Sequence, residues 1–261
     1  MPVKFVTFNL RCDRPQDGVN RFAGRQPLIL RTLGREKPDV ICFQEVEPHM
    51  AAWLRQSLPD YCAVGCGRGV KFDSEQMTVA FRKEAFQLLE LHTFWLSETP
   101  DVPGSRYPGQ SSCPRICTEA VLMEAGGRVF RVFNTHLDHV GGEARERGLA
   151  QILRRAEQDG PFTGTPMILA GDFNAEPDSA EMALLETYPG LTNATRTIGA
   201  TYHGYGKADP PEQIDYIVLR GAVRCERVGR WTDADRGVYL SDHYPVCAEL
   251  RWAEPEEGKA E

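Results

Sequence analysis

The sequence predicts an α/β protein in which two β-sheets pack together and helices cover their outer faces. Apolar runs recur along most of the 261 residues, and several of them are continuous rather than alternating. Continuous apolar runs are typical of strands that are buried on both faces of their sheet. Helical patterns separate the early strands, whereas the middle of the chain is a succession of strands, which favours two sheets over a single doubly wound sheet.

Strands are expected wherever β-branched and aromatic residues gather between turn residues. In chain order they cover residues 3–10, 39–46, 77–83, 86–96, 116–124, 129–137, 166–174, 215–221 and 243–252. Helices are expected where apolar residues recur at a spacing of three and four. They cover residues 26–36, 49–58, 143–158 and 179–188.

Two long segments, 97–115 and 193–213, follow neither period and contain several Pro or Gly residues. Long irregular segments in a compact domain are usually functional, so we expect both to form rims of a substrate site. No internal repeat or linker divides the chain. We therefore expect a single domain over residues 1–252 and an acidic, disordered tail over residues 253–261.

The charge balance bears on the kind of partner. The chain carries 30 basic and 37 acidic residues, for a net charge of −7. The tail holds four Glu and one Lys, and setting aside four candidate site carboxylates leaves 29 acidic and 29 basic residues. Such a surface offers no general attraction for a polyanion, so indiscriminate DNA binding is not expected.

The sequence also bears on cellular location and redox state. No apolar run approaches the ~18 residues of a membrane span, and the first residues lack the layout of a secretory leader. We expect a cytoplasmic protein without a membrane span and without an obligate protein partner. The eight cysteines are then expected to be reduced and mostly buried, because disulfides are rare in that compartment.

Polar side chains fall where the predicted strands end or begin. Asn9, Glu45, His136, Asp172 and Asn174 close strands, whereas Asp215, Asp242 and His243 precede theirs. Carboxylates and imidazoles beside loops are placed for a site rather than for a core. If all of them share one mouth, the last strands must run opposite to the earlier ones, which predicts mixed or antiparallel sheets.

The donor types in this set indicate the chemistry. Carboxylates, amides and imidazoles are present, but no thiolate, and hard oxygen ligands favour Mg²⁺ or Mn²⁺ over zinc. Such an ion can neutralise developing charge and orient an attacking water. The imidazoles can stabilise the negative charge of a phosphate.

Six motifs in order carry a family resemblance: TFNLR, QEV, THL, GDFN, IDYI and SDHYPV. Between residue 5 and about residue 247 they resemble the endonuclease/exonuclease/phosphatase (DNase I-like) superfamily. The segment FWLSETPD (94–101) is similar to a subgroup of mostly bacterial metal-dependent hydrolases within it. The resemblance implies a four-layered α/β/β/α sandwich of two mixed, mainly antiparallel sheets flanked by helices, and a single catalytic domain.

The resemblance also implies a cofactor and a reaction. Glu45 is implied as the principal ligand of Mg²⁺ (or Mn²⁺), with Asn9 beside it and Asp242 close to the ion. The implied reaction is hydrolysis of a phosphate ester, a phosphodiester being favoured, by metal-assisted in-line attack of water. The substrate class stays open among nucleic acids, nucleotides and small phosphoesters.

Roles in catalysis are implied for five more residues. Asp172 resembles the residue that orients or deprotonates the attacking water, and Asn174 the residue that positions it or the phosphate. His243, held by Asp215, resembles the histidine that stabilises the pentavalent phosphate. His136 resembles a second phosphate-contacting histidine.

Other interpretations stay open beside these. Arg115 resembles a phosphate-contacting arginine but serves equally well as a loop anchor. The segment THLDHVGG (135–142) is superficially similar to the zinc signature of metallo-β-lactamase-type hydrolases, with two of its residues missing. A third possibility is a non-catalytic binding module on the same fold. Tyr202, His203 and Tyr205 are interpreted as turn and packing residues.

Overall fold

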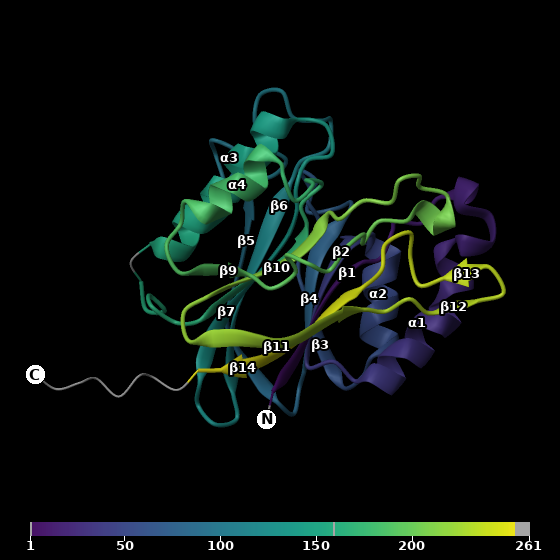
Figure 1. Cartoon of the computed structure of the whole chain (residues 1–261), viewed down its shortest axis with the longest axis horizontal. Helices are drawn as coiled ribbons and strands as arrows, with labels where there is room; N and C mark the ends of the chain where they lie inside the picture. The colour runs from purple at the N-terminus through teal and green to yellow at the C-terminus, as the bar shows by residue number, and fades with distance from the viewer. Residues whose placement is uncertain (1, 159, 254–261) are drawn as a thin grey trace, which may run out of the picture.

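Two six-stranded sheets pack face to face in the computed structural model of the chain, which describes residues 2–158 and 160–253 (Figure 1). The first sheet has the order β11 (Val223–Arg230), β14 (Val246–Trp252), β1 (Val3–Asn9), β2 (Val40–Val46), β4 (Gln76–Arg82) and β3 (Tyr61–Val64). The second has the order β5 (Phe86–Trp95), β6 (Ile116–Glu124), β7 (Val129–His136), β8 (Met167–Asp172), β10 (Asp215–Arg220) and β9 (Leu191–Asn193). A small ribbon pairs β12 (Ala234–Asp235) with β13 (Val238–Tyr239).

Helices form the two outer layers. The first sheet is covered by α1 (Phe22–Glu36) and α2 (Pro48–Ser57), and the second by α3 (Gly142–Glu157) and α4 (Ala180–Glu186) (Figure 1). Two short 3₁₀ helices, η1 (Pro15–Asn20) and η2 (Gly204–Gly206), lie in loops. The predicted four-layered sandwich is confirmed. No helix among the described residues is both long and apolar enough to cross a membrane.

Three hydrophobic cores separate the four layers, and each inner strand contributes to two of them. In β1, Phe5 packs between the sheets, whereas Val6 and Phe8 pack under α1 and α2. In β8, Ile168 packs between the sheets and Leu169 under α3 and α4. Because both faces of these strands are buried, apolar residues occur on both faces and not only at every second position.

The strand directions bring the predicted site residues to one end of the sandwich. β1 runs parallel to β2, and β7 runs parallel to β8. β14 runs antiparallel to β1, and β10 runs antiparallel to β8. The carboxyl ends of four strands therefore lie beside the amino ends of two others, so the prediction of mixed sheets is confirmed.

Some predicted elements differ from those observed. The helix predicted at 26–36 begins earlier, at Phe22. Its first turn was not predicted because Gly24 and Pro27 are poor helix formers and weaken the helical pattern there. The strand predicted at 243–252 begins only at Val246. The edge strands β3, β9 and β11 were not expected: β3 and β9 are short, and β11 carries mostly exposed or half-buried polar residues, so its apolar pattern is weak.

Two further predictions concern the tail and the cysteines. The acidic tail, from residue 254 onward, lies outside the described residues. All eight cysteines are free thiols. Three of them are buried, namely Cys12, Cys42 and Cys117, and the other five are half-buried.

Candidate active site

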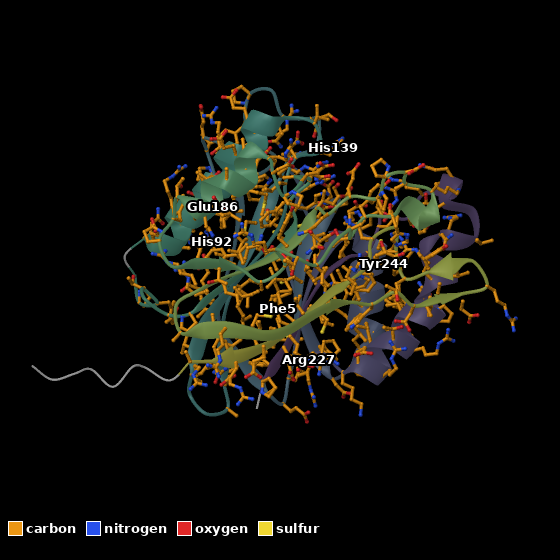
Figure 2. The ribbon with its side chains drawn as sticks, viewed as in Figure 1. Phe5, His92, His139, Glu186, Arg227 and Tyr244 are labelled. Atoms are coloured by element: carbon orange, nitrogen blue, oxygen red, sulfur yellow. The ribbon has the colours of Figure 1, made fainter. Side chains whose placement is uncertain are left out.

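A cavity of about 460 Å³ opens where the strand ends converge. His139 lines it and lies at the upper end of the sandwich in Figure 2, away from Arg227 at the lower end. Seven of the nine predicted site residues line this cavity: Glu45, Arg115, His136, Asp172, Asn174, Asp242 and His243. The other two, Asn9 and Asp215, are buried and hydrogen-bonded to residues of that wall.

Asn9 is a hydrogen-bonding centre between the two sheets. It follows Phe5 on the face of β1 that looks toward the second sheet, where residues two apart share a face. Its Nδ2 donates to Glu45 Oε1 at 3.1 Å and to Asp172 Oδ2 at 2.9 Å. Its Oδ1 accepts the backbone N–H of Arg11 at 2.9 Å, which fixes the orientation of the amide.

Glu45 owes its direction to a bulge in β2. The register of β2 against β4 shifts between Phe43 and Val46, and Glu45 has a φ of 58°. A bulge of this kind re-aims a side chain at the edge of a site. Glu45 Oε2 accepts the backbone N–H of Cys12 at 2.9 Å, and although burial opposes its charge, that bond and nearby Arg11 help to hold its pKa below the usual range.

Asp172 stands at the end of β8 because the preceding glycine allows β8 to approach β7. Gly171 has a φ of 149°, and a Cβ at this position would overlap the carbonyl oxygen of Thr135. Asp172 then continues the face of Ala170 that looks toward the first sheet. In the GDFN motif the glycine thus allows the close approach of the two strands, and the aspartate directs a carboxylate toward the first sheet.

Asp172, Asp215 and His243 form a buried chain of charges. Asp215 is the direct cross-strand partner of Asp172 on the same face of the sheet. His243 lies between them: its Nδ1 is 2.8 Å from Asp215 Oδ2 and its Nε2 is 3.8 Å from Asp172 Oδ2. Three ligand atoms of these residues lie within 4.8 Å of one another, close enough to hold a metal ion.

The charges in this chain shift one another's ionisation. Burial disfavours an imidazolium, but the carboxylates of Asp215, Asp172 and Asp242 together outweigh it and raise the pKa of His243 to about 10. Burial, reinforced by neighbouring Asp215, raises the pKa of Asp172. At neutral pH the site therefore holds a protonated His243 beside a carboxylate that accepts a proton more readily than an exposed one.

His136 ends β7 on the opposite side of Asp172. Its Nε2 is 3.5 Å from Asp172 Oδ2, and its Nδ1 is buried without a hydrogen-bond partner among the described residues. Burial, and then nearby Arg115, lowers the pKa of His136 well below its usual value. His136 is therefore a neutral imidazole, unlike His243.

Asn174 no longer belongs to the strand that it was predicted to end. β8 stops at Asp172, and Asn174 turns back with a φ of 48°. Its backbone N–H donates to Asp172 Oδ1 at 2.9 Å, while its Nδ2 donates to the carbonyl of Leu137 at 3.0 Å. It lines the cavity and locks the orientation of Asp172.

Asp242 lies in the loop before β14, facing the loop after β1. Its Oδ1 accepts the hydroxyl of Ser241 at 3.1 Å, and its Oδ2 lies 3.5 Å from Arg11 Nε. Burial raises its pKa. Asp242, from the loop before β14, and Glu45, from the bulge in β2, thus supply carboxylate oxygens to the same cavity.

Arg115 lies on the other side of the cavity and contacts both Asp138 and His139. Its Nε lies 3.3 Å from Asp138 Oδ1 and its Nη2 lies 2.7 Å from His139 Nδ1. Asp138 also accepts the backbone N–H groups of Val140 and Gly141, so it anchors a loop. A carboxylate used in this way is not free to bind zinc, and His139 is largely exposed.

Arg68, Glu75 and Tyr202 also line the cavity and were not predicted as site residues. Arg68 donates from Nη2 to Glu75 Oε1 at 2.8 Å, and both side chains are buried. A signal was present in the run GCGRG (65–69), because a Cβ on Gly67 would overlap the backbone of Asp73 in a tight loop.

Tyr202 packs against the catalytic imidazole predicted at position 243. The two ring centroids are 5.0 Å apart, and residues 202 and 243 form an isolated β-bridge. His203 and Tyr205, by contrast, are packing residues: the His203 ring stacks on Tyr244 at 4.0 Å. The rim from segment 193–213 therefore contributes one aromatic side chain to the cavity.

A family model described as the Endonuclease/Exonuclease/phosphatase family matches residues 6–243, which is most of the chain. The chain belongs to the endonuclease/exonuclease/phosphatase family. The resemblance inferred from the six ordered motifs is thereby confirmed.

Family members with solved structures share the whole fold. One from Bacteroides vulgatus is 30% identical with a TM-score of 0.90, over 97% of this chain and 99% of that chain. A mannosyl-6-phosphatase from Bacteroides thetaiotaomicron is 27% identical with a TM-score of 0.87, over 96% of this chain and all of that chain. Human Protein angel homolog 2 is 29% identical over 195 residues, which are 64% of this chain and 31% of that protein. The chain thus spans about a third of the length of this human relative.

Proposed function

We propose that this family member hydrolyses a phosphate ester with the help of Mg²⁺ or Mn²⁺. The observation that carries the proposal is the convergence of Glu45, Asp172 and Asp242 on one cavity that also holds the protonated imidazole of His243. Residues 1–252 act as a single catalytic domain in this proposal. A cytoplasmic location stays a prediction.

The donors fit a hard divalent cation. Glu45 and Asp242 offer carboxylate oxygens, and burial raises the pKa of the neighbouring Cys12 thiol, which disfavours a thiolate ligand beside them. Oxygen ligands of this kind suit Mg²⁺ or Mn²⁺. Asn9 lies beside them as predicted, and its Nδ2 holds Glu45 and Asp172 in place. When bound, the ion would polarise the phosphate and neutralise developing charge.

We interpret Asp172, Asp215 and His243 as a set of interacting side chains that orients the His243 ring, and not as a second metal site. Asp215 already accepts a hydrogen bond from His243 Nδ1 at 2.8 Å, which fixes the ring and its charge. His243 Nε2 is then the donor left to face a phosphate oxygen. Asp172, with its raised pKa and its orientation set by Asn174, is suited to take a proton from the attacking water.

Turnover of synthetic phosphate esters by purified protein tests the proposal. Metal is removed by chelation, and Mg²⁺ or Mn²⁺ is then restored. We expect Glu45→Gln and Asp172→Asn to lower turnover by roughly 100-fold or more, because each removes a charge that no neighbour replaces. Glu186→Gln on the outer helix α4 is the matched control and should leave turnover unchanged (Figure 2).

Three outcomes would contradict the proposal. If neither ion supports turnover, the proposed catalytic function is wrong and the alternative of a non-catalytic binding module is favoured. Full turnover in both site variants would show that the chemistry occurs elsewhere. Turnover that returns only with zinc would favour the zinc hydrolase suggested by residues 135–142.

A further inference from the structure

The wall of the cavity that faces the carboxylates is basic. It is formed by Arg68 from the glycine-rich loop before β4, Arg115 directly before β6, and His136 at the end of β7. Arg68 is 6% exposed, Arg115 3% and His136 6%. Arginine is rarely buried to this degree unless its charge meets an anion.

These three groups are held close enough to disturb one another. After burial itself, the neighbouring Arg68 is the strongest influence lowering the pKa of Arg115. Both arginines also lower the pKa of His136. Like charges confined together in a buried site cost free energy unless an anion lies among them.

The carboxylates on this wall do not satisfy all of its donors. Glu75 accepts from Arg68 Nη2, and Asp138 accepts from Arg115 Nε. The Nη1 atoms of both arginines are donors that are buried without a hydrogen-bond partner among the described residues. Nδ1 of His136 is also unpartnered there, and it donates or accepts according to the tautomer of the neutral ring. A buried donor left without an acceptor is costly, so an unmet group of this kind points to a ligand.

The number of unpaired donors on the basic wall can be compared with the number of phosphate oxygens that each class of ester offers. A phosphodiester has two non-bridging oxygens, and a phosphomonoester has three. With one oxygen directed toward His243 and the proposed metal, a diester keeps a single oxygen for the basic wall, whereas a monoester keeps two. Two buried arginines and an imidazole match the second case, since each guanidinium can bind its own phosphate oxygen.

We propose that the substrate is a phosphomonoester whose terminal phosphate is bound by Arg68 and Arg115. This rests on the hydrolytic function proposed above and departs from the phosphodiester favoured by the sequence. Hydrolysis forms a bond from phosphorus to the water oxygen and breaks the bond from phosphorus to the alcohol oxygen. Of the two water protons, one ends on the alcohol and one stays on the inorganic phosphate.

A matched pair of esters with one leaving group provides the test: p-nitrophenyl phosphate and methyl p-nitrophenyl phosphate, each assayed with Mg²⁺ or Mn²⁺. We expect kcat/KM to be at least tenfold higher for the monoester. Arg68→Met and Arg115→Met should each lower the monoester value roughly 10- to 100-fold while changing the diester value by less than about fivefold. Arg128→Met, at an exposed position, is the control and should change neither.

The ratio of the two kcat/KM values is measured within one preparation, so a loss of folded protein cancels. A second measurement is the binding of inorganic phosphate to the metal-free protein, which should weaken at least tenfold in both site variants. A diester preference in the wild type, or equal losses on both esters in the variants, would overturn the monoester assignment and leave the hydrolytic function intact. No turnover of either ester would overturn both.

Discussion

Arg25 is a buried cation whose removal should destabilise the fold measurably. It lies on α1 with no exposed surface. Its Nε donates to the carbonyl of Asn20 at 2.7 Å, and its Nη1 donates to Leu10 at 2.6 Å and to Leu240 at 2.9 Å. Its Nη2 donates to the carbonyl of Arg11 at 2.8 Å. One side chain thus joins the loop after β1 to the loop before β14.

The expected magnitude follows from these four bonds. Arg25→Met leaves four carbonyls without their donor, and at about 1 kcal/mol or more for each the loss is about 4 kcal/mol. Methionine avoids the cost of burying a charge, which offsets part of this, so we expect a net loss of about 3 kcal/mol. For a domain of this size that corresponds to a fall in Tm of roughly 6–12 °C.

Urea unfolding followed by circular dichroism measures the loss. Arg31→Met is the matched control, because Arg31 lies on the same helix and its side chain is 57% exposed in a surface ion pair with Asp235. We expect the control to change the free energy of unfolding by less than about 0.5 kcal/mol. Arg25→Lys, which keeps the charge but not the planar group, should fall between the two. A loss below about 1 kcal/mol in Arg25→Met would refute the reasoning.

Two further predictions concern stability. Burial lowers the pKa of His203 to about 4, so the unfolded chain binds a proton that the folded chain refuses between pH 6.5 and 4; stability from this group is complete above pH 6.5 and is lost as the pH falls through 4. His203→Phe should therefore lose less stability than the wild type between pH 7 and 4 in urea titrations, and an identical pH dependence would contradict this. Gly171→Ala should yield insoluble or strongly destabilised protein, because its Cβ overlaps the carbonyl of Thr135; a thermal melt within a few degrees of the wild type would show that β7 and β8 can separate.

The fold was predictable from the sequence because both faces of its inner strands are buried. A strand in a one-sided sheet alternates apolar and polar residues, whereas these strands contain continuous apolar runs, such as residues 40–43 and 167–170. Edge strands escape this rule. β11 is exposed along much of its length, so solvent-compatible residues leave little pattern to read.

The acidic half of the site was predictable for a related reason. Asn9 and Asp172 continue the inner face of an apolar strand, and a polar residue at that point interrupts a regular pattern. The direction of the Glu45 side chain was not predictable in the same way, because it depends on a bulge and a positive φ that no residue pattern in the sequence indicates. Arg68 lies in a loop without periodicity, so only its flanking glycines marked it.

The two halves of the cavity are therefore built differently. The acidic half supports the proposed reaction, and the basic half supports the proposed choice of substrate. The carboxylates and His243 sit on or beside strands whose register is fixed by two cores, so the chemistry they support is set by the fold. Arg68 and Arg115 are supplied by a glycine-rich loop and by the end of an irregular segment. Loops tolerate change that strands do not. In our proposal the donors of the basic wall, and not the carboxylates, therefore determine which ester this chain accepts.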